Sequence, residues 1–133
     1  MPFDVTTVGI GVLLTLTLLG VTLFLRERAL RKTQVMQPGF QPQIRLPCTD
    51  EWTLYHNPFS LCSKKIRVCL AEYDVSYDSV AIDLIETGSY QNISREFLKV
   101  NPGATVPVLL HNGHPIYESH EQLTYVASMV DDA

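Results

Sequence analysis

The chain of 133 residues has few cysteines and little positive charge in its C-terminal part. Three cysteines at irregular spacing do not make the even set that a disulfide-stapled domain needs, and no pair has the spacing of zinc ligands. The four histidines have no acidic partner at ligand spacing, so we expect no metal site. Residues 51–133 carry five basic and eleven acidic side chains, a net charge of −6. A net-acidic domain argues against nucleic acid as a partner, because phosphate contacts need a basic surface.

Near the N-terminus the chain lacks charge altogether. Residues 5–25 form a run of 21 positions without a charged side chain. A helix of that length rises about 31 Å, close to the ~30 Å hydrocarbon core of a bilayer. A cleavable signal peptide carries positive charge before its apolar run and small residues after it, and this sequence has the reverse order. We therefore predict a single-pass transmembrane anchor in residues 1–32, with residues 5–25 in contact with lipid. A buried helix of a soluble protein is the alternative, which an all-round apolar surface fits poorly.

Basic residues follow the apolar run directly. By the positive-inside rule, they predict that the C-terminal part faces the cytosol. A reducing cytosol agrees with the small cysteine count. The same cations are suited to anionic lipid, although a plain topology signal is the simpler interpretation. Residues 33–50, which contain three prolines, are predicted to be a linker. The basic residues are Arg26, Arg28, Arg31 and Lys32.

Residues 51–133 are predicted to form one α/β domain. Short alternating runs indicate strands and helical spacing indicates helices. Asn112-Gly113 is typical of a two-residue hairpin turn, and Ser119 and Gln122 have capping-box spacing. The order βαβ followed by αββα predicts a mixed four-stranded sheet of the thioredoxin-like type, with a parallel pair and an antiparallel hairpin. The strands are 52–56, 76–82, 106–110 and 116–117, and the helices are 63–73, 90–100 and one beginning at 119.

Two segments of this domain carry a family resemblance. LYHNPFSLCSKKIRVCLAE resembles the first strand, active-site loop and first helix of the glutathione transferases. NPGATVPVLLHNGHPIYES resembles the NP-x-x-x-VP segment, hairpin and E/Q-S motif of the same family. The loop Ser60-Leu61-Cys62-Ser63 is similar to the S-x-C-S loop of the zeta-like class. In order and at matching spacing, these motifs make residues 51–133 similar to the N-terminal, thioredoxin-like domain of glutathione transferases.

The resemblance implies two candidate reactive groups. Ser60 falls where the family places its catalytic serine, which donates a hydrogen bond to the glutathione sulfur and favours the thiolate. Such a bond to a charged group is worth ~1.5–3 kcal/mol. An ordinary helix N-cap is the alternative for Ser60. Cys62 is the alternative nucleophile, because a thiol at a helix N-terminus can form a mixed disulfide with glutathione; otherwise it is a partly buried structural thiol. Ser60 and Ser63 occupy the two redox-cysteine positions, so a dithiol oxidoreductase is not expected.

The resemblance also implies a glutathione-binding set. The Val106-Pro107 bond is expected to be cis, which turns the Val106 backbone toward the tripeptide; a trans proline opening a strand is the alternative. Glu118 is expected to receive the ammonium of the γ-glutamyl group. The Ser119 hydroxyl and nearby helix N-terminal amides are expected to receive its carboxylate, and Ser119 is also suited to a plain N-cap.

The resulting hypothesis is a membrane-anchored glutathione-binding domain that activates the thiol of glutathione, its co-substrate, for attack on an electrophile. Transferases of this family have a second, all-helical domain that supplies most of the electrophile pocket, whereas this sequence ends at Ala133. A fragment, a truncated product and a stand-alone module are therefore all open. A non-catalytic thioredoxin-fold binding module tethered to a membrane is the alternative function. The resemblance also leaves a homodimer open.

Overall fold

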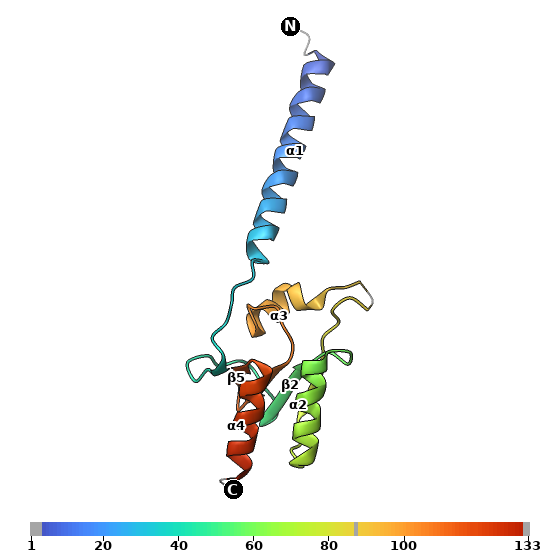
Figure 1. Cartoon of the computed structure of the whole chain (residues 1–133). Coiled ribbons are helices and arrows are strands. Elements are labelled where there is room, and N and C mark those ends of the chain that lie inside the picture. The colour runs from blue at the N-terminus through green and yellow to red at the C-terminus, as the bar shows by residue number, and fades with distance from the viewer. Residues whose placement is uncertain (1–3, 87, 132–133) are drawn as a thin grey trace. The chain divides into compact units, whose positions relative to one another are not determined.

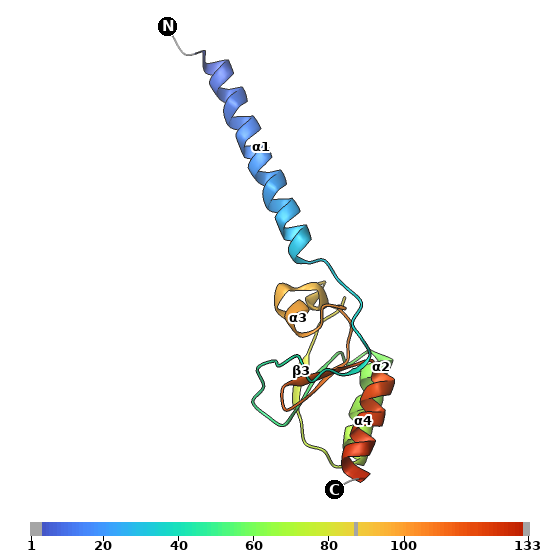
Figure 2. The ribbon, with the colours of Figure 1, turned by 90° about the vertical axis from the view of Figure 1, so that its left-hand side faces the viewer.

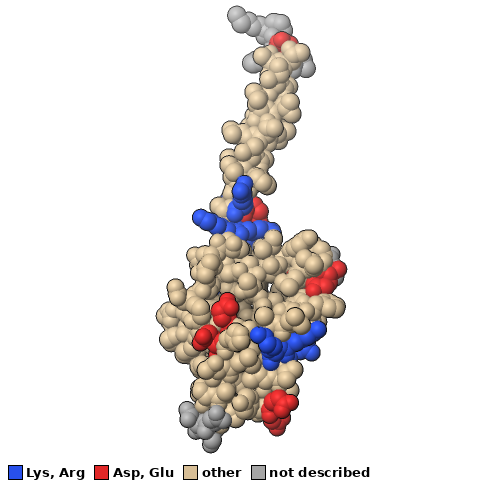
Figure 3. Space-filling model, viewed as in Figure 1, with Lys and Arg blue, Asp and Glu red and all other residues tan. Residues whose placement is uncertain are grey.

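The computed structural model describes residues 4–86 and 88–131. The chain divides into two units, residues 1–32 and 33–133, each described by itself. The first unit is the helix α1, Val5–Leu30 (Figure 1). Its N-cap is Asp4, whose side chain accepts a hydrogen bond from the Thr6 amide at 3.2 Å. The large apolar side chains of α1 are exposed, and the face drawn in Figure 3 shows no charged side chain between the acidic group at the N-terminal end of the helix and the charged residues at its C-terminal end. The predicted apolar helix is thereby confirmed.

The second unit is a mixed sheet covered by helices. The strand order is β1-β5-β4-β2-β3, in which β2 and β3 are parallel and the other pairs are antiparallel. The thioredoxin-like α/β class and the mixed sheet are confirmed. The strands are β1 Gly39–Phe40, β2 Trp52–His56, β3 Asp78–Ala81, β4 Val108–His111 and β5 His114–Tyr117. The helices are α2 Leu61–Glu72, the 3-10 turn η1 Gln91–Ile93, α3 Arg95–Val100 and α4 Ser119–Asp131.

Alternation along β4 builds two cores, one on each face of the sheet. Leu109 packs with Ile66 and Leu70 of α2 and Val126 of α4. Its neighbours Val108 and Leu110 point the other way and belong to a second cluster that includes Phe97 of α3. Successive side chains of a strand point to opposite faces, so this alternation places the helices. Figures 1 and 2 show α2 and α4 side by side on one face and α3 on the other.

The hairpin between β4 and β5 has the predicted two-residue turn. Asn112 and Gly113 have φ values of 52° and 83°, as a type I′ turn requires. A side chain at Gly113 is also excluded by its surroundings, because a Cβ atom there would lie 2.6 Å from the Leu46 carbonyl oxygen. The backbone of residues 33–50 therefore lies directly against this turn.

The sheet has five strands, not the four predicted. The extra strand β1 lies in the segment expected to be a linker. Its Phe40 stacks on Tyr125 of α4, with ring centroids 5.0 Å apart. Beyond β1, the Gln41 amide donates to the Pro115 carbonyl at 2.9 Å and the Leu46 amide to the Gly113 carbonyl at 2.8 Å. A two-residue strand among prolines leaves no alternating pattern in the sequence, which is why it was missed.

The helix predicted over residues 90–100 is in fact two short pieces, η1 and α3. Ser94 separates them with an extended backbone, and its hydroxyl accepts a hydrogen bond from the Phe97 amide at 3.1 Å. Serine competes for local backbone groups in this way, and so it begins a new helix instead of continuing the preceding turn.

Candidate functional site

A small cleft gathers five of the six residues singled out in the sequence. The Val106-Pro107 peptide bond is cis, as predicted. The turn that contains it forms one wall of the cleft, and the corner between β5 and α4 forms the other. The first turn of α2 closes the end. The cleft has a volume of about 200 Å³ and is lined by Cys62, Thr105, Val106, Pro107, Glu118 and Ser119.

The corner between β5 and α4 holds an acidic residue in an unusual conformation. Glu118 has φ +68°, in the left-handed region, which costs a non-glycine residue about 1–2 kcal/mol. Its carbonyl accepts the Gln122 amide at 3.0 Å, and its side chain is exposed. Ser119, only 9% exposed, begins α4. A carboxylate thus stands beside a hydroxyl at the N-terminus of α4, an arrangement able to hold the ammonium and carboxylate of one amino acid.

Ser60 does not line this cleft. It is the N-cap of α2, and its hydroxyl oxygen accepts the Ser63 amide at 3.2 Å. That bond uses the oxygen as an acceptor. Within the described part of the chain, the O–H of Ser60 donates no hydrogen bond. The N-cap role and the predicted donor role are therefore compatible in one side chain.

Asn57, which directly follows the strand predicted over residues 52–56, holds the loop before α2 and was not predicted to do so. It is 1% exposed. Its side-chain oxygen accepts the amides of Phe59 and Ser60, at 2.9 and 3.2 Å. Its side-chain nitrogen donates to the Ile82 carbonyl and to Glu86 Oε1, both at 2.9 Å. Asn57 thus connects the loop that carries Ser60 to the residue that follows β3.

Gln122 does not form the predicted capping box with Ser119. Its side-chain nitrogen instead donates to the carbonyls of Pro107 and Ile116, at 3.0 and 2.8 Å. The acceptors lie 6 and 15 positions before Gln122, outside the spacing of a capping box, so that pattern gave no signal for them.

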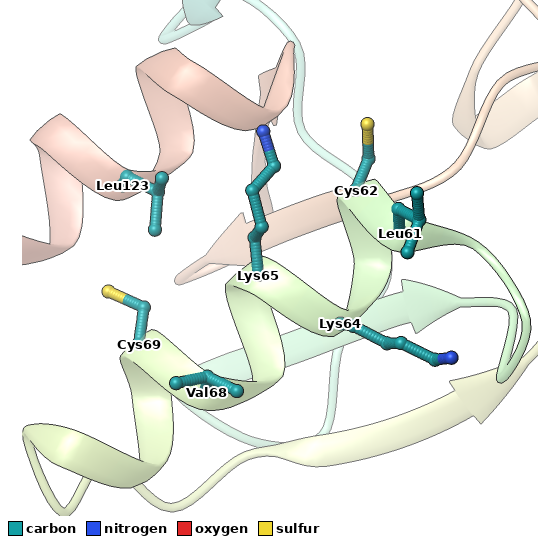
Figure 4. Close-up of a pocket in the computed structure, with 7 residues that line it drawn as sticks. All are labelled: Leu61, Cys62, Lys64, Lys65, Val68, Cys69 and Leu123. Carbon is teal, nitrogen blue, oxygen red and sulfur yellow. The ribbon is translucent and has the colours of Figure 1, made fainter.

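Cys62 lines the cleft and also an apolar groove beside it. The groove has a volume of about 860 Å³ and runs between α2 and α4. Figure 4 shows the Cys62 and Lys65 side chains projecting to the same side of α2. Burial raises the pKa of the Cys69 thiol, which keeps it protonated at neutral pH. Of the two thiols in the groove, Cys62 is exposed and Cys69 half-buried, so Cys62 is the more accessible of the two. The groove is lined by Leu61, Cys62, Lys64, Lys65, Val68, Cys69 and Leu123.

His56 is buried at the end of β2. Its Nε2 lies 2.8 Å from the Ser79 hydroxyl, and its Nδ1 has no partner among the described residues. Burial lowers the pKa of His56, and the nearby Arg67 lowers it further. Among residues 4–86 and 88–131, no three histidine, cysteine or acidic side chains are grouped to hold a metal ion. His56 therefore belongs to the structure of the strand end.

The fold and the cleft define the class of protein, a thioredoxin-like α/β domain with a cis-proline turn at a helix N-terminus. Residues 59–129 match the family model described as the glutathione S-transferase N-terminal domain. The chain belongs to this family, as the motifs predicted.

Several known proteins share this domain. The chain is 34% identical over 86 residues to glutathione S-transferase TCHQD of Arabidopsis thaliana, covering 60% of this chain and 31% of that protein. It is 38% identical over 77 residues to maleylacetoacetate isomerase of Dictyostelium discoideum, covering 58% and 35%. The match to maleylacetoacetate isomerases supports the resemblance of the Ser60-Leu61-Cys62-Ser63 loop to the zeta-like class. A crystal structure of a Sulfitobacter glutathione transferase homologue with bound glutathione matches with a TM-score of 0.56 and 25% identity, over 63% of this chain and 39% of that one. The chain spans about a third of the length of the curated relatives it matches.

Proposed function

We propose that residues 51–133 bind glutathione in the cleft between the cis-proline turn and the β5–α4 corner. The observation that carries the proposal is the convergence of Val106, Pro107, Glu118 and Ser119 on one cleft beside the start of α2. Family membership and the glutathione-bound homologue support it. The γ-glutamyl end lies at Glu118 and Ser119, the Val106 backbone pairs with the peptide, and the sulfur lies toward the first turn of α2.

Two side chains compete for the thiol chemistry. In the transferase function, the free O–H of Ser60 donates to the glutathione sulfur. A stabilisation of ~1.5–3 kcal/mol lowers the pKa of the bound thiol by about one to two units. In the other mechanism, the thiolate of Cys62 attacks one sulfur of oxidised glutathione. A Cys62–glutathione disulfide forms, and one reduced glutathione leaves as the thiolate.

The transferase function also needs a place for the electrophile. The apolar groove shares Cys62 with the cleft and exposes Leu61 and Val68 by 75% and 60%. It is the surface on which an apolar electrophile, or the remainder of a longer protein, meets the bound thiol. The position of Ser60 outside the cleft lining favours the second candidate function, a binding module without catalysis.

We further propose that α1 crosses a membrane with residues 33–133 in the cytosol. The helix is long and apolar enough to do so, and the basic residues that follow it support the orientation. Protease added to sealed vesicles from the cytosolic side should digest the domain. Full protection of the domain would overturn the orientation.

Calorimetric titration of glutathione into the full chain, held in nanodiscs, tests the binding proposal. Ultraviolet absorbance of the bound thiolate then separates the two reactive groups. Ser60→Ala should raise the pKa of the bound thiol by about one to two units with little loss of affinity, whereas Cys62→Ala should change neither. A glutathione adduct on Cys62 in intact-mass spectra, abolished by Cys62→Ala, would assign the chemistry to the cysteine. No binding by the wild-type chain would overturn the glutathione site.

A further inference from the structure

Gln122 is a fully buried polar residue in α4, at 0% exposure. Both protons of its side-chain amide are used, one on the Pro107 carbonyl and one on the Ile116 carbonyl. Its side-chain oxygen is buried and has no partner among the described residues. An apolar side chain of the same length would fill this space without burying an unmatched acceptor. The two donated bonds therefore distinguish glutamine from an apolar residue at this position.

The two carbonyls belong to the place where the β4–β5 ladder ends. Leu109 pairs with Ile116, so the same register continued would set Pro107 opposite Glu118. The ladder cannot continue there. Proline has no N–H to donate, and Glu118 leaves the sheet with φ +68°. The Gln122 amide occupies this end of the ladder and supplies the donors that the backbone does not.

The carbonyls also lie in the backbone segments that form the two walls of the cleft. Pro107 is part of the cis-proline wall. Ile116 lies two residues before Glu118, at the start of the opposite wall. Gln122 itself does not line the cleft. The buried side-chain amide of Gln122 thus connects the two walls by hydrogen bonds without lining the cleft itself.

We propose that Gln122 is a positioning residue that sets the spacing between the Val106-Pro107 wall and the Glu118-Ser119 wall. The identity of the ligand as glutathione rests on the function proposed above. The role of Gln122 in setting the distance between the walls does not depend on that function. A tripeptide that contacts both walls is sensitive to their separation, just as a misplacement of ~1 Å in a catalytic site can cost about 10²-fold in rate.

Gln122→Met tests the inference, since methionine has a similar length and no donor. Val126→Ala is the matched control. It lies one turn later in α4, is equally buried in the core between the sheet and the helices α2 and α4, and does not line the cleft. Both variants are made in the full chain in nanodiscs and studied at a temperature at which circular dichroism shows them folded. The measurements are glutathione titration and the amide NMR shifts of Val106 and Ser119 in the free protein.

Gln122→Met should weaken glutathione binding by about tenfold and should shift the Val106 and Ser119 amide resonances. Val126→Ala should lower stability and leave both measurements as in the wild type. Equal effects in the two variants, or wild-type affinity and shifts in Gln122→Met, would overturn the positioning role. If the wild-type chain binds no glutathione, the proposed function fails, and the amide shifts of the free protein alone decide the role of Gln122.

Discussion

The helices α1 and α4 are both rich in apolar residues but distribute them in opposite ways. In α1 the apolar side chains surround the helix, and those such as Leu13 and Phe24 are exposed. In α4 they gather on one side, where Val126 is buried against the sheet. A one-sided apolar stripe is satisfied by packing within the domain, whereas an all-round apolar surface is typical of a helix that is buried in a protein core or spans a membrane. The distribution of apolar residues, more than their number, decides which helix belongs to the folded domain.

The largest expected effect is the loss of membrane association when charged residues interrupt the apolar surface of α1. Leu13→Arg combined with Leu18→Arg should shift the chain from the membrane fraction to the soluble fraction, because each central arginine costs ~2.5–3.5 kcal/mol on insertion. Fractionation after carbonate extraction measures it. The control places the same charges on exposed positions of the domain, as Ser76→Arg with Ser128→Arg, and should stay with the membrane. Retention of the α1 variant would contradict the anchor.

The next largest effect is a loss of stability that we expect from a substitution in the core of the domain but not from one in α1. Leu109→Ala should lower the free energy of unfolding of the domain by about 2–5 kcal/mol, because it empties a fully buried position. Leu16→Ala in α1 removes the same atoms from an exposed side chain and should leave that free energy unchanged. Urea titration of both variants in detergent, followed by Trp52 fluorescence, makes the comparison. A comparable loss in Leu16→Ala would show that α1 packs on the domain.

A smaller difference is expected at the helix caps. Ser94→Ala should cost the domain about 1 kcal/mol, because Ser94 caps α3 through the Phe97 amide. Asp4→Ala removes the corresponding bond to Thr6 at the start of α1, and the unfolding of the domain should not register it. The same urea titration measures both.

The smallest effect is a pH dependence confined to the domain. Burial holds the folded-state pKa of His56 below its unfolded value of ~6.5. Its neutral form is favoured by folding, so this stability is fully present above about pH 6.5 and is lost as the pH falls toward the lower folded pKa. His56→Gln should flatten the fall in stability between neutral and mildly acidic pH. His120→Gln, at an exposed position, should keep the wild-type slope; a flattened slope in both would point to another group.

Much of the fold could be predicted because its elements carry local patterns. Strand β2 ends at Asn57-Pro58, the hairpin turns at Asn112-Gly113, and α2 repeats its buried positions at helical spacing. Strand β1 could not be predicted, since its two residues are extended only because β5 offers an open edge. The break between η1 and α3 likewise depends on how one serine hydroxyl is used.

The site likewise contains residues that could be predicted from the sequence and residues that could not. Val106, Pro107, Glu118 and Ser119 stand in motifs that can be recognised by order and spacing. The roles of Asn57 and Gln122 could not be predicted, because the Asn57 amide bonds to the Ile82 carbonyl 25 positions away and the Gln122 amide to the Pro107 carbonyl 15 positions away. Sequence shows which groups face a ligand more readily than it shows which groups hold them.

The two-residue strand β1 has a mechanical consequence. Tension along the chain from residue 32 reaches the domain first at the Gln34–Pro102 hydrogen bond and then at the pairing of β1 with β5. These few bonds lie at the rim of the sheet and open one after another, while β2 and β4 stay paired in its centre. We therefore expect the segment 33–50 to detach and lengthen under load before the central strands β2 and β4 separate.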